Sequence, residues 1–153
     1  MSTGFGYDGV VMPHQPIGLV LTRTSRTVSR AFDERLAAAG GSLPLWLILL
    51  ALKTQTVRSQ SDLADAVGIR GATLSHHLGG MEAAGLVTRR RDPASRRTSL
   101  VELTDAGTRL FLRLREASVA HDKRLRAGLS DEEVGYLATL LDTLAFNATN
   151  ASA

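Results

Sequence analysis

Cysteine is absent from the sequence, and so are long apolar runs. Without cysteine the chain can form no disulfide and no thiolate zinc site, and it cannot sense oxidants through a thiol. The longest apolar run, residues 45–52, is too short to cross a bilayer. Residues 1–16 lack the basic start and the apolar stretch of a signal peptide. We therefore expect a cytoplasmic protein without a membrane partner.

Net charge is small, but the charges are unevenly distributed. The chain of 153 residues carries a net charge of only +3. Residues 86–103 contain five arginines: Arg89, Arg90, Arg91, Arg96 and Arg97. Two carboxylates oppose them there, so this segment alone has the net charge of the whole chain. A concentrated basic segment on a neutral body is typical of a protein that contacts phosphates at one place.

Sequence signatures of catalysis and metal binding are also missing. The chain has no Gly-x-Ser-x-Gly elbow, no P-loop and no complete dinucleotide fingerprint. Its acidic residues gather at the starts of predicted helices, where capping explains them. Among its four histidines, His76 and His77 are adjacent and would diverge by about 100 degrees on a helix, so they cannot easily share an ion. We expect no catalytic residue, no metal site and no cofactor.

Hydrophobic periodicity and capping signals predict six helices and one hairpin. The helices are expected at about 17–39, 43–53, 59–68, 71–84 and 105–126, with a last one from about 130. Strands are expected at 86–91 and 97–103, joined by the turn-forming residues 92–95. Two short helices joined by a glycine-containing turn predict a helix-turn-helix, and the hairpin after them predicts a wing.

The predicted fold is therefore mainly α with a small β-hairpin wing: a winged helix-turn-helix plus terminal dimerisation helices. We divide the chain into a flexible segment (1–16), a dimerisation helix (17–42), a winged helix-turn-helix domain (43–104), two dimerisation helices (105–148) and a tail (149–153). Because the terminal helices flank a complete small domain, we expect their apolar stripes to meet each other and a second copy of the chain.

The second helix of the helix-turn-helix has one apolar and one open face. Leu74, Leu78 and Met81 form its inward stripe, which turns small residues and His76 outward. Small residues would let this helix lie close to the DNA major groove. The DNA contacts expected around it are Arg70, Thr73, Ser75 and His76. We expect His77 to lean toward the edge of the core instead.

Residues 85–107 carry the most specific motif in the chain. A glycine, leucine and valine precede a basic strand, a turn with aspartate and arginine, and then a leucine and threonine just before a glycine. In this pattern the chain resembles the MarR family of winged helix-turn-helix regulators. The matching residues are Asp92, Arg96, Arg97, Leu103, Thr104 and Gly107. The sequence departs from the family at Ser95, where an aspartate is common, and at His76 and Gly80, where basic residues are frequent.

The resemblance implies a homodimer that binds a pseudo-palindromic site in double-stranded DNA. It further implies a regulator, here expected to be a repressor, that often releases DNA when a small phenolic or other aromatic ligand binds. In the family register Arg97 is the wing-tip residue that enters the minor groove, with Arg96 as the second choice. The strand arginines Arg89, Arg90 and Arg91 are expected on flanking phosphates.

An aromatic cleft and a different class of function complete these hypotheses. Phe32, Trp46 and Phe111 could line a ligand cleft, although aromatic residues at helical spacing more often form core. The main alternative to a DNA-binding regulator is a sensor of small molecules or metal whose winged helix serves as an interaction module. Salt-sensitive, sequence-selective binding to duplex DNA would separate the two.

Overall fold

The computed structural model describes residues 6–7, 10–11, 15–54 and 59–150, and it describes side chains from residue 15 onward except those of Arg96 and Arg97. The chain divides into two compact units, Met1–Ser118 and Val119–Ala153. Helix α5 begins in the first unit and ends in the second.

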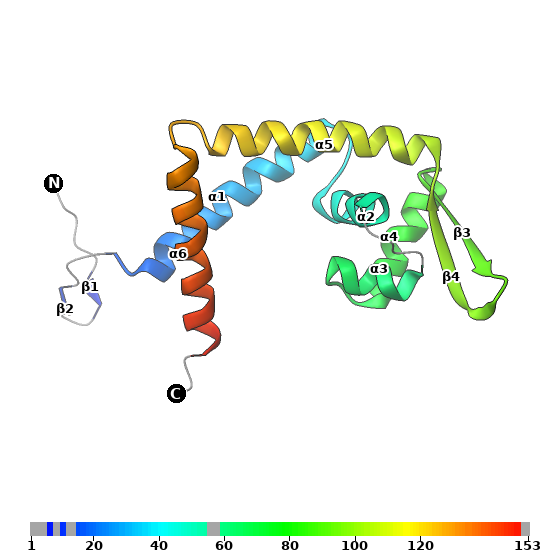
Figure 1. The fold of residues 1–153 in the computed structure, drawn as a ribbon, viewed down its shortest axis with the longest axis horizontal. Helices are drawn as coiled ribbons and strands as arrows, with labels where there is room; N and C mark the ends of the chain where they lie inside the picture. The colour runs from blue at the N-terminus through cyan, green and yellow to red at the C-terminus, as the bar shows by residue number, and fades with distance from the viewer. Residues whose placement is uncertain (1–5, 8–9, 12–14, 55–58, 151–153) are drawn as a thin grey trace. The chain divides into compact units, whose positions relative to one another are not determined.

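The order of elements confirms the predicted fold class (Figure 1). The elements are β1 (Gly6–Tyr7), β2 (Val10–Val11), α1 (Ile17–Ala38), α2 (Leu43–Thr54), α3 (Gln60–Val67), α4 (Gly71–Ala83), β3 (Val87–Asp92), β4 (Ser95–Leu103), α5 (Asp105–Leu125) and α6 (Asp131–Thr149). Strands β1 and β2, which pair antiparallel, were not expected from the sequence. They fall within the predicted flexible segment, most of which lies outside the described residues.

Local signals explain where the short helices begin and end. The Ser59 side chain accepts a hydrogen bond from the Asp62 backbone N–H at 3.1 Å, which caps α3. Gly68 follows in the left-handed region, with φ of 74°, and ends this helix. A complete capping box between Ser130 and Glu133 starts α6 in the same way. These caps set the lengths of α3 and α6.

The core of the first unit lies between α2 and the helices around it. Trp46, Ile48, Leu49 and Ala51 are buried on α2, which explains its all-round hydrophobicity. The predicted inward stripe of α4 is confirmed, because Leu74, Leu78 and Met81 are all buried. Core residues from the other elements are Leu36, Leu63, Ala64, Val87, Val101, Leu110, Phe111 and Leu114. This shared core fixes α4 against α2, α3 and the hairpin.

The turn of the hairpin is shorter than expected. Strand β3 reaches Asp92 and β4 starts at Ser95, so the turn is only Pro93 and Ala94, held by an Ala94 N–H that donates to Asp92 Oδ1 at 2.9 Å. The extra strand residues were missed because the turn-forming composition of 92–95 reads as loop. Asp92 pairs with Ser95, whereas Arg91 pairs with Ser99. Residues 96–98 therefore form a bulge on β4 beside the tip.

Thr104 joins the hairpin to α5. Its hydroxyl donates to the carbonyl of Gly85 at 2.6 Å and accepts from the N–H of Gly107 at 3.0 Å. Its own N–H donates to the carbonyl of Leu86 at 3.1 Å. Thr104 thus caps α5 and also fixes the start of α5 to the base of the hairpin.

The second unit exposes an apolar helix face. No residue of α6 is buried, although Leu137, Leu140 and Leu141 project from one side of it. The first turns of α1, in the other unit, likewise expose Ile17 and Leu21. Amphipathic helices gain most of their stability from burying the apolar face. We therefore expect these exposed faces to pack against another protein surface.

A helix that crosses a membrane must be long and predominantly apolar. Within residues 15–54 and 59–150, no single helix meets that requirement. Helices α1 and α2 meet it only when taken together, across a bend of 74°.

Candidate nucleic-acid interface

Helix α4 turns an open face away from the core. Ala72, Thr73, His76 and Gly80 are exposed there, and no atom lies within 4 Å of the position that a Cβ would take at Gly80. Ser75 and His77 are half-buried on its two flanks. Gly79, one of the small residues expected outward, is also half-buried. The open face is thus smooth, with two hydrogen-bonding side chains, Thr73 and His76.

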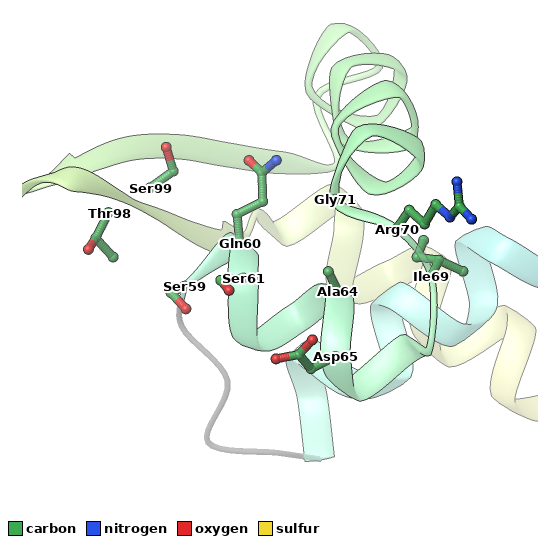
Figure 2. A pocket seen from close by; sticks show the side chains of 10 residues that line it. All are labelled: Ser59, Gln60, Ser61, Ala64, Asp65, Ile69, Arg70, Gly71, Thr98 and Ser99. Atoms are coloured by element: carbon green, nitrogen blue, oxygen red, sulfur yellow. The ribbon is translucent and has the colours of Figure 1, made fainter.

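Arg70 precedes this helix at its N-cap position. Its side chain is exposed and makes no capping hydrogen bond. In Figure 2 it extends outward from the turn before α4. The guanidinium therefore lies at the end of α4 where Thr73 is also found, and its role as a DNA contact stays a prediction.

A groove of about 670 Å³ runs between α3, the turn before α4 and strand β4. Its lining residues are Ser59, Gln60, Ser61, Ala64, Asp65, Ile69, Arg70, Gly71, Thr98 and Ser99 (Figure 2). Most of its polar groups are uncharged hydroxyls and an amide, which donate hydrogen bonds readily to phosphate oxygens.

Sequence reasoning missed the polar groups of this groove except Arg70. Ser59 and Leu100 form an isolated antiparallel bridge, which brings the start of α3 beside β4. Scattered serines and threonines form no motif that predicts a shared surface. It is the bridge between Ser59 and Leu100 in the structure that shows that these residues line one groove.

Of the three hairpin arginines whose side chains the structure describes, two are held by carboxylates. Arg89 donates to Glu82 Oε2 through both Nε, at 2.9 Å, and Nη2, at 2.7 Å. Arg90 Nη2 lies 3.0 Å from Glu102 Oε1. The hydrogen bond and the charge of Glu102 raise the pKa of Arg90 above its ordinary value, so its positive charge is retained.

The other three hairpin arginines lie close to the turn. Arg91 is exposed on β3, and among the described side chains no carboxylate lies within ion-pair distance of it. Arg96 and Arg97 lie in the β4 bulge next to the turn, which agrees with a place near the wing tip. Their side chains are outside the described residues, so the choice of Arg97 over Arg96 stays a prediction.

The three aromatic residues considered for a ligand cleft come together in the core. The rings of Trp46 and Phe111 stack with centroids 5.7 Å apart and an angle of 15° between planes. Phe32 is partly buried against the same core. None of the three lines the groove described above, nor a second cavity of about 360 Å³ that includes His76, His77 and Met81.

The histidines do not gather with other ligands. The rings of His76 and His77 lie edge to face with centroids 5.9 Å apart. In the part of the chain that the structure describes, no three histidine or acidic side chains are placed to hold a metal ion. His14 lies outside the described residues.

Comparison with known proteins gives consistent matches. A family model described as MarR family matches residues 42–98. An uncharacterised HTH-type transcriptional regulator of Bacillus subtilis, YdgJ, is 36% identical over 95 residues, which are 62% of this chain and 58% of that protein. A putative regulatory protein for the hcr operon of Thauera aromatica is 29% identical over 129 residues, 84% of this chain and 78% of that protein. The match to the first relative thus spans less than two thirds of its length.

Solved structures agree with these relatives. The transcriptional repressor CouR, solved bound to a 23-mer DNA duplex, superimposes with a TM-score of 0.76 at 27% identity, covering 85% of this chain and 92% of that one. CouR from Rhodococcus jostii RHA1 bound to p-coumaroyl-CoA superimposes with a TM-score of 0.70 at 26% identity, covering 86% and 93%. The curated relatives are described as transcriptional regulators and not as enzymes. Over residues 42–98, which hold most of its winged helix-turn-helix, the chain is thus similar to the MarR family.

Proposed function

We propose that this protein is a homodimeric transcriptional regulator that binds a specific site in double-stranded DNA. The observation that carries the proposal is the open face of α4, with Thr73 and His76 on a smooth surface and Arg70 at its start. Small residues let a helix enter the major groove, where hydroxyl and imidazole groups can bond to base edges. Ser75 lies at the flank of this face, and its hydroxyl contacts the phosphate backbone of the DNA.

The hairpin supplies the second set of DNA contacts. Its tip, with Arg97 or Arg96, enters the adjacent minor groove, whose negative potential attracts arginine. Arg91 binds a flanking phosphate, while Arg89 and Arg90 add positive charge close to the backbone. One DNA strand follows the groove between α3 and β4, where Ser61, Thr98 and Ser99 hydrogen-bond to phosphate oxygens.

The assembly is a dimer of this chain. The apolar faces of α1 and α6 support it, because Ile17, Leu137 and Leu141 are each at least 39% exposed in a single copy. A two-fold dimer presents two α4 helices to two half-sites about one helical turn, roughly 34 Å, apart. This arrangement favours a pseudo-palindromic operator.

We further propose that the protein is a repressor controlled by a small aromatic ligand. The support comes from CouR, a repressor solved both with DNA and with p-coumaroyl-CoA. Phe32, Trp46 and Phe111 remain the aromatic residues proposed to meet such a ligand. Because Trp46 and Phe111 are part of the core that also holds α4, a ligand that repacks them would shift α4.

This function involves neither a catalytic residue nor a cofactor, and it places the protein in the cytoplasm, where bacterial operators lie. Footprinting of the DNA next to its own gene tests the proposal. Two protected half-sites spaced by about one helical turn, at nanomolar protein, would support it. Protection without sequence preference, seen only at low salt, would overturn it in favour of an interaction module that does not read DNA.

A further inference from the structure

A single ion pair connects the recognition helix to the hairpin. Glu82 lies in the last turn of α4 and Arg89 on β3, with the tight turn at Gly85 between them. Two nitrogens of Arg89 donate to one Glu82 oxygen, at 2.9 and 2.7 Å. The side chains are 28% and 41% exposed, for Arg89 and Glu82 respectively, so the pair is partly shielded from water. Two donors on one acceptor oxygen restrict the direction as well as the distance of the contact.

The other hairpin ion pair makes a useful contrast. Arg90 and Glu102 belong to the two strands of the same hairpin, and their side chains are 54% and 57% exposed. That pair therefore restrains the hairpin internally. Among the described side chains, Glu82 with Arg89 is the one ion pair that ties the hairpin to α4.

The charge of Glu82 is unfavourable for simple attraction to DNA. A carboxylate beside a DNA-binding surface repels phosphates, and here it also neutralises one of the five hairpin arginines. Any favourable contribution of Glu82 to DNA binding must then come from the way it orients the hairpin relative to α4. The angle between α4 and the hairpin sets the spacing between base contacts in the major groove and arginine contacts in the next minor groove.

We propose that Glu82 is a positioning residue for DNA specificity, which it exerts through Arg89 by holding the hairpin at a fixed angle to α4. The inference rests on the proposed DNA-binding function. When the hairpin is held at the wild-type angle to α4, the major-groove and minor-groove contacts can form together only on the operator. A hairpin that moves freely relative to α4 can form both sets of contacts on many DNA sequences.

The matched variants E82Q and E102Q test this role, because each removes one negative charge from a hairpin arginine. Affinity for the operator and for a shuffled duplex would be measured at one salt concentration. If charge alone matters, both variants bind both duplexes more tightly and keep the wild-type ratio. The proposal predicts that E82Q lowers the ratio of operator to shuffled affinity about five-fold, the effect of losing a well-formed ion pair, while E102Q keeps it. The exchanged pair, E82R with R89E, should recover most of the ratio.

A measurement without DNA separates this proposal from the proposed function. Because the chain has no cysteine, spin labels can be placed at cysteines introduced by Ala72→Cys and Ala94→Cys, in copies diluted with unlabelled protein. The distance between label sites on α4 and the hairpin turn should be sharply distributed in the parent and in E102Q and clearly broader in E82Q. Equal distributions in all three, or an unchanged affinity ratio in E82Q, would overturn the positioning role. A wild-type protein that does not prefer its operator, with a broadened distribution in E82Q, would instead overturn the proposed function and leave the mechanical coupling in place.

Discussion

Gly107, in the first turn of α5, lies directly against the backbone carbonyl of Leu86 at the base of the hairpin. A Cβ at position 107 would overlap that oxygen, and it would also meet the Leu103 side chain at 3.1 Å. The same carbonyl accepts the Thr104 N–H. The close approach of α5 to the hairpin therefore requires glycine at this position.

Replacement of this glycine gives the first prediction. Gly107→Ala should lower the free energy of unfolding by roughly 1–3 kcal/mol, because backbone atoms must move apart to admit the methyl group. Thermal or urea denaturation measures the change. Gly80→Ala is the control, since its Cβ meets nothing within 4 Å, and alanine in an exposed helix should add about 0.5–1 kcal/mol. Equal effects of the two substitutions would refute the close packing at Leu86.

Arg91 and Arg90 should contribute differently to DNA binding, although they are neighbours. Arg91→Ala should weaken binding to every duplex and reduce the slope of log affinity against log salt by about one, because a phosphate contact is lost. Arg90→Ala should change that slope less, because Glu102 already holds its guanidinium. Titrations from low to moderate salt measure both slopes, and a larger loss in Arg90→Ala would contradict the assignment.

His76 should contribute to operator affinity from the open face of α4. Its exposed imidazole can donate a hydrogen bond to a base edge in the major groove. His76→Ala should therefore weaken operator binding by roughly 1–3 kcal/mol and change binding to a shuffled duplex much less.

The half-buried neighbour provides the control for this experiment. His77→Ala should keep the operator affinity and lower the melting temperature, because its side chain is partly packed. Fluorescence anisotropy at fixed pH and ionic strength compares the three proteins. An unchanged operator affinity in His76→Ala would remove this residue from the DNA contacts, and a loss of affinity only in His77→Ala would show that the assumed face of α4 is wrong.

The exposed face of α6 should hold the dimer together. Aspartate at both Leu137 and Leu141 would place two charges in an apolar interface, so the double variant should be a monomer by light scattering and should bind the operator at least ten-fold more weakly. Thr139→Asp, on the opposite side of the helix, should remain a dimer. A double variant that stays dimeric and fully active would exclude this face from the interface.

The sequence predicted the winged helix well, because its signals there are local. Capping at Ser59, the left-handed Gly68 and the stripe of Leu74, Leu78 and Met81 each determine structure over a few residues. The position of the hairpin was predicted correctly, but the strand ends that flank its turn were not. Turn-forming residues such as Ser95 joined the strand because a bulge at 96–98 absorbs the irregular register.

Features that depend on distant residues could not be predicted from the sequence. Nothing in the local sequence indicates that Glu82 would meet Arg89, or that Ser59 would lie beside Leu100. The strand arginines were expected as one set of phosphate contacts, yet Arg89 and Arg90 face carboxylates and Arg91 faces none among the described residues. The sequence gives the net charge of a segment, but it does not show which ion-pair partner each charged side chain has.

The most direct test of the account is the ratio of affinities for the operator and for a shuffled duplex of equal length, measured with wild-type protein at physiological salt. A regulator that reads bases through α4 should bind the operator in the nanomolar range and prefer it by a factor on the order of 10³ or more. Similar, weak affinities for both duplexes, each lost as salt is raised, would contradict sequence-specific recognition by this protein.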